Sequence, residues 1–454
     1  MSKTKSMTAG NPYSLILAFA LPLMAGNVFQ QLYTVFDTMI VGQFLGVTAL
    51  AALGTTDWFN WMMIGMIQGL TQGFGILMAQ AFGAGDHGRL RKVTGNSILL
   101  TIISAVILLV LGQLLMRPVL LLLQTPEEVL GIALSYLRII FAGIPIVMAY
   151  NLLACILRSL GDSRTPLIAM VIAALTNIGL DILFVGSFGM GVQGAAIATV
   201  LAQLLSALFC LRQILKIEIL RLSRSDFSLE ARLCGRLLYM GMPMALQNML
   251  ISVGGMVVQS VVNSFGVLFI AGFTATNKLY GVLEIAAISY GYAMTTYMGQ
   301  NLGAGKLDRI RKGMRAMLVI GTATSLIIAA CMFGFGRMIL SLFISGTPEE
   351  VEETLSIAFH FLSVMSAFLP ALYLVHIARN AVEGLGNSSM PLMSGLAELV
   401  MRLSAALFLT RIMGPTALFW GEVLAWFGAD IVLVIAYLVV LGRVRWTLAP
   451  ASAE

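Results

Sequence analysis

Twelve apolar runs, each long enough to cross a lipid bilayer, restrict the fold of this chain more than any other feature. A spanning helix needs about 20 predominantly apolar residues. Inside the bilayer no water is available to the backbone, so such a run must form a helix. The expected spans are residues 13–42, 48–82, 93–116, 128–157, 165–187, 190–212, 236–265, 268–301, 315–339, 351–381, 390–411 and 415–442. The sequence therefore predicts an all-α polytopic membrane protein with twelve transmembrane helices.

The composition excludes several other classes of protein. Of the 454 residues, 59% are hydrophobic and 11% are charged, whereas soluble domains carry about 25% charged residues. A soluble enzyme, a disordered chain and a nucleic-acid-binding module are therefore excluded despite the net charge of +6. No cleavable signal peptide is expected, because the first apolar run is too long for one. The four scattered cysteines indicate neither a disulfide framework nor a metal site; they are Cys155, Cys210, Cys234 and Cys331.

The basic residues predict the orientation of the chain in the membrane. If the N-terminus is cytoplasmic and the spans alternate, the cytoplasmic side receives 20 Lys and Arg residues. The opposite side receives only Arg117, Arg337 and Arg411. Cytoplasmic loops of membrane proteins carry an excess of Lys and Arg. Both termini are therefore expected in the cytoplasm.

The chain also repeats itself at a nearly constant distance. QAFGAGDHGRLRK (80–92) returns as QNLGAGKLDRIRK (300–312), and RSLGDSRTPL (158–167) returns as EGLGNSSMPL (383–392). Pro22 and Asn27 have counterparts in Pro243 and Asn248. These recurrences predict two homologous lobes of six helices, residues 1–222 and 223–454. Because six is even, the two lobes have the same orientation and pair about an axis along the membrane normal.

Polar residues recur with helical spacing in three spans of the first lobe. They are Asn27, Gln30, Gln31, Thr34, Asp37 and Thr38 in the first span, Asn177 and Asp181 in the fifth, and Thr199, Gln203 and Ser206 in the sixth. A charged side chain at the bilayer centre costs about 2.5–3.5 kcal/mol on insertion scales, so a carboxylate there needs a cation, a proton or a polar network. If the stripes converge, their oxygen atoms suit H⁺ or Na⁺. The alternative is that they only pack against neighbouring helices.

A substrate cavity is expected to draw on both lobes. The candidate lining residues are Gln30, Gln31, Thr34, Met63, Met66, Gln203, Gln247 and Glu284. Met, aromatic, Gly and Gln side chains in the second span can form an adaptable wall for varied apolar ligands. Ordinary helix packing is the competing interpretation for any one methionine.

The second lobe has a different set of polar residues. Glu398 and Arg402 have the i,i+4 spacing of an ion pair within one helix. The group of His376, Arg379, Asn380 and Glu383 indicates a gate or packing network rather than a metal site, because one His with one Glu is poor ligand chemistry. Two further acids, Glu422 and Asp430, have no evident partner in the sequence.

Three segments carry a resemblance to a known family. LPLMAGNVFQQLYTVFDTMIVGQFLGVTALAALG, QAFGAG with QNLGAG, and NIGLD with GVQGAAIATV resemble the multidrug and toxic compound extrusion (MATE) family, in its DinF-like prokaryotic branch. The resemblance implies a V-shaped MOP-type fold with alternating access, in the prokaryotic cytoplasmic membrane and monomeric. It also implies that Asp37, Asn177, Asp181 and Thr199 bind the coupling ion, and that helix bending at Pro22 responds to protonation of the acid pair. A C-terminal cation site of the NorM-like branch is doubtful here, because the seventh span offers no Glu and the tenth no Asp.

The function implied is secondary antiport, in which drugs or organic, often cationic and amphipathic compounds leave in exchange for H⁺ or Na⁺. No cofactor and no metal other than Na⁺ at this site are expected; the partners are small molecules and the bilayer, not nucleic acid. The alternative is a MOP-type flippase or exporter of a lipid-linked or other endogenous metabolite. That would favour a cluster of basic residues, which the bases within the spans do not obviously form: Arg138, Lys278, Arg379 and Arg402. A membrane enzyme is not expected, because HExxH and GxSxG are absent.

Overall fold

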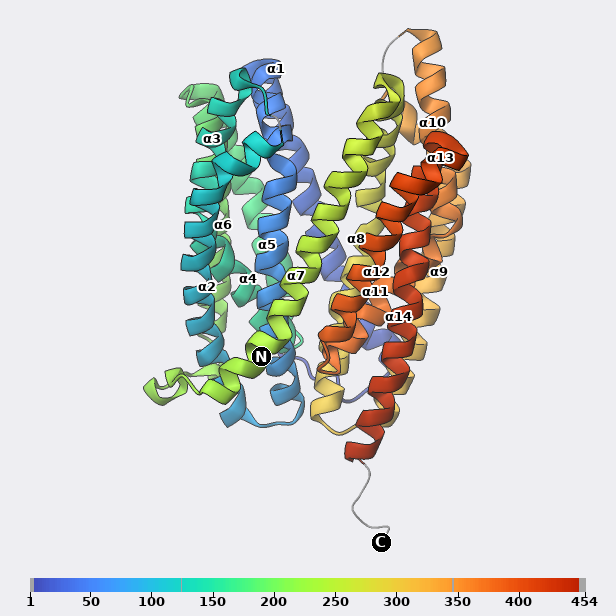
Figure 1. Cartoon of the computed structure of the whole chain (residues 1–454). Helices are drawn as coiled ribbons and strands as arrows, with labels where there is room; N and C mark the ends of the chain where they lie inside the picture. The colour runs from blue at the N-terminus through green and yellow to red at the C-terminus, as the bar shows by residue number, and fades with distance from the viewer. Residues whose placement is uncertain (1–3, 124, 345–346, 449–454) are drawn as a thin grey trace. The chain divides into compact units, whose positions relative to one another are not determined.

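The computed structural model describes residues 4–123, 125–344 and 347–448, and this part of the chain is helical and contains no β-strand. Its helices form two compact units, shown in Figure 1. Unit 1 comprises residues 4–7 and 21–245, and unit 2 comprises residues 8–20 and 246–448. The sequence analysis divides the chain at residue 222, in a loop, whereas the compact units divide inside two helices, between Ala20 and Leu21 and between Ala245 and Leu246.

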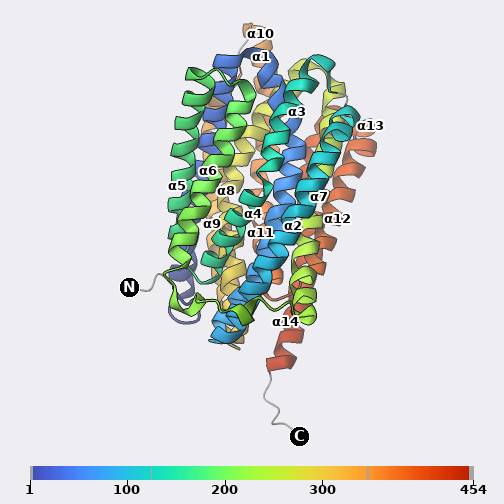
Figure 2. The same ribbon diagram turned by 90° about the vertical axis from the view of Figure 1, so that its left-hand side faces the viewer.

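Unit 1 contains the first six predicted spans, except for residues 13–20 at the start of the first span. Helix α1 holds two of them, because its backbone breaks at Gly46 with φ of 81°, a conformation that glycine adopts without steric cost. The helices are α1 (Pro12–Gly83), α2 (His87–Leu122), α3 (Glu127–Ala142), α4 (Ile144–Ser159), α5 (Arg164–Asp181) and α6 (Gly191–Ile214). Helices α5 and α6 pack against each other and lie side by side in Figures 1 and 2.

Unit 2 repeats this arrangement with the remaining helices. They are α7 (Ala231–Val262), whose first half lies in unit 1, then α8 (Val267–Gly303), α9 (Leu307–Ser341), α10 (Pro348–Ala367), α11 (Leu369–Gly384), α12 (Ser389–Ser404), α13 (Thr410–Met413) and α14 (Ala417–Leu448). Two predicted spans are bent pairs of helices, α3 with α4 at 47° and α10 with α11 at 52°. In each pair a proline, Pro145 or Pro370, follows the bend.

The internal duplication extends to local backbone features. Helix α5 begins at Arg164 and α12 begins at Ser389, and each continues into a π-helical segment, Ile182–Ser187 or Ala405–Leu409. The glycines that open the following turns match as well, since Gly191 has φ of 64° and Gly414 has φ of 65°. These matched landmarks give the register in which residues of the two units correspond.

Hydropathy and length agree with repeated crossing of a membrane. Within the described ranges, eight helices are long and apolar enough to span, and the two bent pairs raise this number to ten. One of the eight is the stretch Ser389–Arg445, which at 57 residues and with a turn at Gly414 holds two of the predicted spans. The remaining predicted span is α8, whose 37 residues include Lys278 and Glu284. The chain is an all-α, multi-pass membrane protein.

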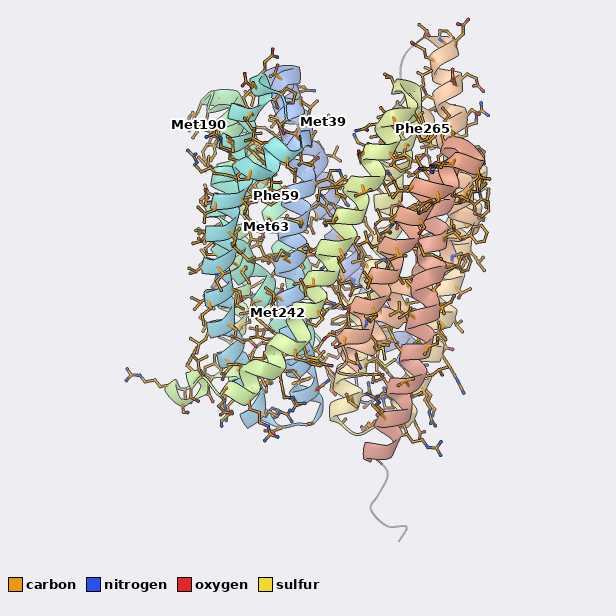
Figure 3. All side chains as sticks on the ribbon, in the orientation of Figure 1. Met39, Phe59, Met63, Met190, Met242 and Phe265 are labelled. Atoms are coloured by element: carbon orange, nitrogen blue, oxygen red, sulfur yellow. The ribbon has the colours of Figure 1, made fainter. Side chains whose placement is uncertain are left out.

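Close helix contacts inside unit 1 depend on small residues. A Cβ on Gly69 would lie 2.4 Å from the backbone nitrogen of Ala245, and one on Gly73 would lie 2.4 Å from the Cα of Gly241. Small residues let membrane helices approach closely where the hydrophobic effect does not drive their association. Nearby, Phe59 and Met63 follow each other along α1 (Figure 3), and the Phe59 ring meets the Phe141 ring edge-on at 5.0 Å.

Candidate functional site

Two buried carboxylates from separate helices meet in unit 1. Asp37 lies in the first half of α1 and Asp181 is the last residue of α5, and their side chains interact directly with each other. Asp37 is 9% exposed and Asp181 is fully buried. Asp37 Oδ1 and both carboxyl oxygens of Asp181 have no hydrogen-bond donor among the described residues. Since two adjacent carboxylates cannot both remain ionised without a cation, the pair requires a proton or a bound cation.

The amide of Asn177 lies one helical turn before Asp181 on α5. The Asn177 side-chain nitrogen donates to Thr199 Oγ1 at 3.3 Å, which links α5 to α6. Asn177 is 1% exposed, and its side-chain oxygen also has no donor in the described part of the chain. The structure thus brings Asp37 together with Asp181 and Asn177 together with Thr199, and the two pairs are joined by the one helical turn between Asn177 and Asp181.

The surroundings of the acid pair are polar but contain no basic group. Tyr33 and Tyr136 both interact electrostatically with Asp37, and Tyr136 also interacts electrostatically with Asp57. In the described ranges, no Lys, Arg or His interacts with either carboxylate of the pair. Sequence reasoning missed both tyrosines. Tyr33 lies four residues before Asp37 and so shares its helix face, but no local signal identifies Tyr136.

The donors of this site are oxygen atoms, which suit hard monovalent cations and protons. Among the residues that the structure describes, no three His, Cys, Asp or Glu side chains group as ligands of a metal ion. The arrangement can therefore bind H⁺ or a small cation such as Na⁺, with Asp37 and Asp181 as the charged groups and Asn177 and Thr199 as neutral ligands.

The predicted substrate-cavity residues fall into three sets. Gln30, Thr34 and Gln203 surround Tyr33 beside the acid pair, and Gln31 is partly buried on the same helix. Met63, by contrast, belongs to the hydrophobic core with 5% exposure, and Met66 packs against that core. A ligand could reach Met63 only by displacing its neighbours, so packing accounts for this residue better than a cavity wall does. The remaining two, Gln247 and Glu284, lie in unit 2.

In unit 2, Glu284 has a partner that the sequence analysis did not foresee. A ring nitrogen of His376 lies 3.0 Å from Glu284 Oε1 and joins α11 to α8. The two side chains are 15% and 25% exposed. The sequence analysis groups His376 with residues of its own helix, and only the tertiary contact between α8 and α11 reveals this pair.

Two arginines of unit 2, Arg379 and Arg402, bind the acids Glu398 and Glu422. Arg402 lies 3.6 Å from Glu398 and 3.0 Å from Glu422, which confirms the predicted i,i+4 ion pair and supplies a partner for Glu422. Arg379 pairs with Glu398 from the other side. Asp430 lies near Arg379 and Glu398 and interacts electrostatically with both. Glu398 and Glu422 are therefore matched by arginines of the chain itself, whereas Asp430 Oδ1 has no hydrogen-bond partner among the described residues.

Comparison with known proteins decides the family. The MatE family model matches residues 22–183 and 243–408, which are the two homologous halves and together make up most of the chain. The chain belongs to the MatE family. This confirms the family resemblance, while the assignment to the DinF-like branch stays a prediction.

Relatives of this MatE chain are found among bacterial proteins. It is 32% identical to the probable multidrug resistance protein YpnP of Bacillus subtilis, over 77% of this chain and 78% of the relative. It is 29% identical to the probable multidrug resistance protein YoeA of the same organism, over 76% and 75%. Among solved structures, a MOP superfamily transporter from Pyrococcus furiosus superposes with a TM-score of 0.90 at 23% identity and covers 99% of both chains. At that identity the likeness shows the fold, which is that of MATE and MOP transporters.

Proposed function

We propose that the chain is a secondary active antiporter that exports organic, often cationic and amphipathic compounds in exchange for H⁺ or Na⁺. The two curated relatives described above are both called probable multidrug resistance proteins, which supports an export function. The observation that carries the coupling step is the pair Asp37 and Asp181, two buried acids without a basic partner among the described residues. Such a pair must bind and release positive charge to persist inside a membrane.

In this proposal the coupling ion acts on the shape of α1. Asp37 lies fifteen residues after Pro22, which lacks a backbone N–H and so leaves a carbonyl one turn earlier without its helical bond. Entry of H⁺ or Na⁺ between Asp37 and Asp181 removes their repulsion and allows α1 to bend at Pro22. The bent and straight forms then differ in affinity for the exported compound, as exchange requires. A potential of 100 mV supplies about 2.3 kcal/mol per charge moved, which can drive the cycle.

We place this transporter in the prokaryotic plasma membrane, with both termini in the cytoplasm and a single chain as the working unit. The excess of basic residues on one side of the spans supports this orientation. No cofactor and no catalytic reaction are part of the mechanism.

The test is efflux from proteoliposomes loaded with a fluorescent cationic dye, with an imposed proton or sodium gradient. Asp37→Asn and Asp181→Asn should each abolish stimulation of efflux by the gradient, because a neutral amide cannot exchange a cation. Asp308→Asn, an equal chemical change at an exposed site on α9, is the matched control and should transport normally. Unchanged gradient-driven efflux in either site variant would refute the proposed coupling.

A second candidate is export or flipping of an endogenous metabolite, such as a lipid-linked compound. The description of the Pyrococcus furiosus transporter points to a binding pocket of reversed polarity and a different function for that protein, so the fold is compatible with other substrates. Against an anionic head group here, Arg379 and Arg402 are already bound by carboxylates. Lack of dye efflux by wild-type protein, with transport of a polyprenyl phosphate in the same vesicles, would favour this candidate.

A further inference from the structure

The duplicated halves allow the ion site of unit 1 to be compared, residue by residue, with its equivalent in unit 2. The starts of α5 and α12 are 225 residues apart, which pairs Asn177 with Arg402. The glycines Gly191 and Gly414, with the same positive φ, are 223 residues apart, which pairs Thr199 of α6 with Glu422 of α14. The two alignments come from different landmarks, the helix starts in one case and the positive-φ glycines in the other, so neither depends on the other.

The contacts support this correspondence. In unit 1 the paired positions form the hydrogen bond from Asn177 to Thr199 at 3.3 Å. In unit 2 the same two positions form the ion pair from Arg402 to Glu422 at 3.0 Å. A neutral link between the two helices in one half has therefore been replaced by a charged link in the other.

The acids of the unit 1 site have no acidic equivalents. The 225-residue register pairs Asp181 with Ala406, and the flanking landmarks of α1 and α7 pair Asp37 with Val257 or Val258. In place of two free acids, unit 2 has Glu398 and Glu422 on either side of the Arg402 guanidinium. Arg402 and Glu398 are both largely buried, with side chains 10% and 5% exposed.

We propose that Arg402 is a tethered cation, which permanently occupies in unit 2 the position where unit 1 binds an exchangeable ion. Glu398 and Glu422 then form a guanidinium site that the chain fills with its own side chain. Because Arg402 is held covalently and cannot leave, unit 2 takes up no coupling ion at this position. The comparison with an exchangeable ion rests on the proposed function of unit 1, but the guanidinium site itself stands on the contacts in unit 2.

Removing the Arg402 side chain should allow a soluble guanidinium to bind between Glu398 and Glu422. Arg402→Ala leaves Glu398 and Glu422 in place with a space that fits methylguanidinium, which can form the same paired hydrogen bonds. We expect the melting temperature of purified Arg402→Ala protein to fall by several degrees and to recover with millimolar methylguanidinium. Tetramethylammonium at equal concentration has no N–H donors and should give no recovery. Wild type and Arg411→Ala, an exposed arginine nearby in the sequence, should respond to neither salt.

A second variant tests the same inference through the internal symmetry. Arg402→Asn with Glu422→Thr rebuilds in unit 2 the neutral hydrogen bond of unit 1, while Glu398 keeps Arg379 as its partner. We expect this double variant to melt higher than Arg402→Asn alone. The inference is overturned if methylguanidinium does not stabilise Arg402→Ala more than it stabilises wild type, or if Arg402→Ala does not fold and the double variant is no more stable than the single one. Both readouts are melting temperatures, so they hold whether or not the acids of unit 1 prove to couple transport.

Discussion

The equivalent sites of the two units solve the problem of buried charge in opposite ways. In unit 1, Asp37 and Asp181 face each other without a basic group among the described residues, so their charge must be balanced by something from outside the protein. In unit 2, Glu398 and Glu422 are balanced by Arg402. Buried carboxylates that the chain neutralises with its own arginine stabilise the fold. Buried carboxylates without a positively charged partner can instead bind and release an ion. This contrast indicates that the duplicated halves have diverged in role.

The largest effect on stability is expected at the charge-matched site. Glu398→Gln removes the carboxylate that lies between Arg379 and Arg402 and leaves buried positive charge without its partner. Breaking a buried ion pair by removing one member costs about 3–5 kcal/mol. Asp181→Asn should cost far less, because it removes a carboxylate that has no partner to lose. Melting curves of the two variants side by side would check this, and equal destabilisation would contradict the contrast between the units.

Introducing an arginine and a glutamate at the equivalent positions of unit 1 should convert its site into one like that of unit 2. Asn177→Arg with Thr199→Glu places a guanidinium and its carboxylate at the positions that correspond to Arg402 and Glu422. We expect transport driven by an ion gradient to fall to background, since the site then carries its own cation. Efflux from dye-loaded proteoliposomes gives the answer. If gradient-driven efflux persists in the folded variant, exchange at this site does not drive transport.

A smaller effect is expected at the partly exposed pair of Glu284 and His376 in unit 2. Glu284→Gln breaks the contact with His376, whose members are 25% and 15% exposed. Solvent screening limits exposed or partly exposed pairs to about 0–1 kcal/mol. The variant should therefore melt close to wild type and well above Glu398→Gln. A loss as large as that of Glu398→Gln would show that exposure is not what separates the two sites.

An effect as modest as that at Glu284 is expected outside the membrane, at a carboxylate of unit 1 that accepts hydrogen bonds from the chain itself. Asp226, in the loop before α7, accepts from the backbone nitrogen and hydroxyl of Ser223, both at 2.7 Å, and these bonds hold the pKa of its carboxyl below the ordinary value. A depressed pKa in the folded state adds stability above the ordinary pKa, and that stability is lost as pH falls through the depressed value. Asp226→Asn should therefore cost about 1 kcal/mol near neutral pH. The difference from wild type in melting temperature should shrink below about pH 4, and a difference that stays constant down to pH 2 would count against this role.

Periodicity in the sequence was enough to locate most of the polar residues of the proposed ion site. Asp37 and the Asn177–Asp181 pair could be recognised because a polar residue in an apolar run is costly and helical spacing places such residues on one face. Tyr136 could not be recognised from the sequence, because its place beside the acids depends on the contact of α3 with helices distant in the sequence. Met63 shows the same limit, because its spacing does not say whether that face of α1 meets a core or a cavity.

The fold was predictable for a related reason. Each apolar run of spanning length must be helical, so the spans and the break at Gly46 follow from composition and one glycine. The bends between α3 and α4 and between α10 and α11 were not predicted, although Pro145 and Pro370 mark both. The partners of Glu284 and Glu422 were missed because both contacts join different helices.

The most direct test of the account is to measure the ion that moves when substrate moves. Proteoliposomes that hold a pH-sensitive or a sodium-sensitive dye report this movement when a cationic substrate is added to drive exchange. For wild type and Asp308→Asn we predict a substrate-dependent flux of one of the two ions, and for Asp37→Asn and Asp181→Asn we predict none. A flux of wild-type size in either of these last two variants would contradict the claim that the unpaired acids of unit 1 carry the coupling ion.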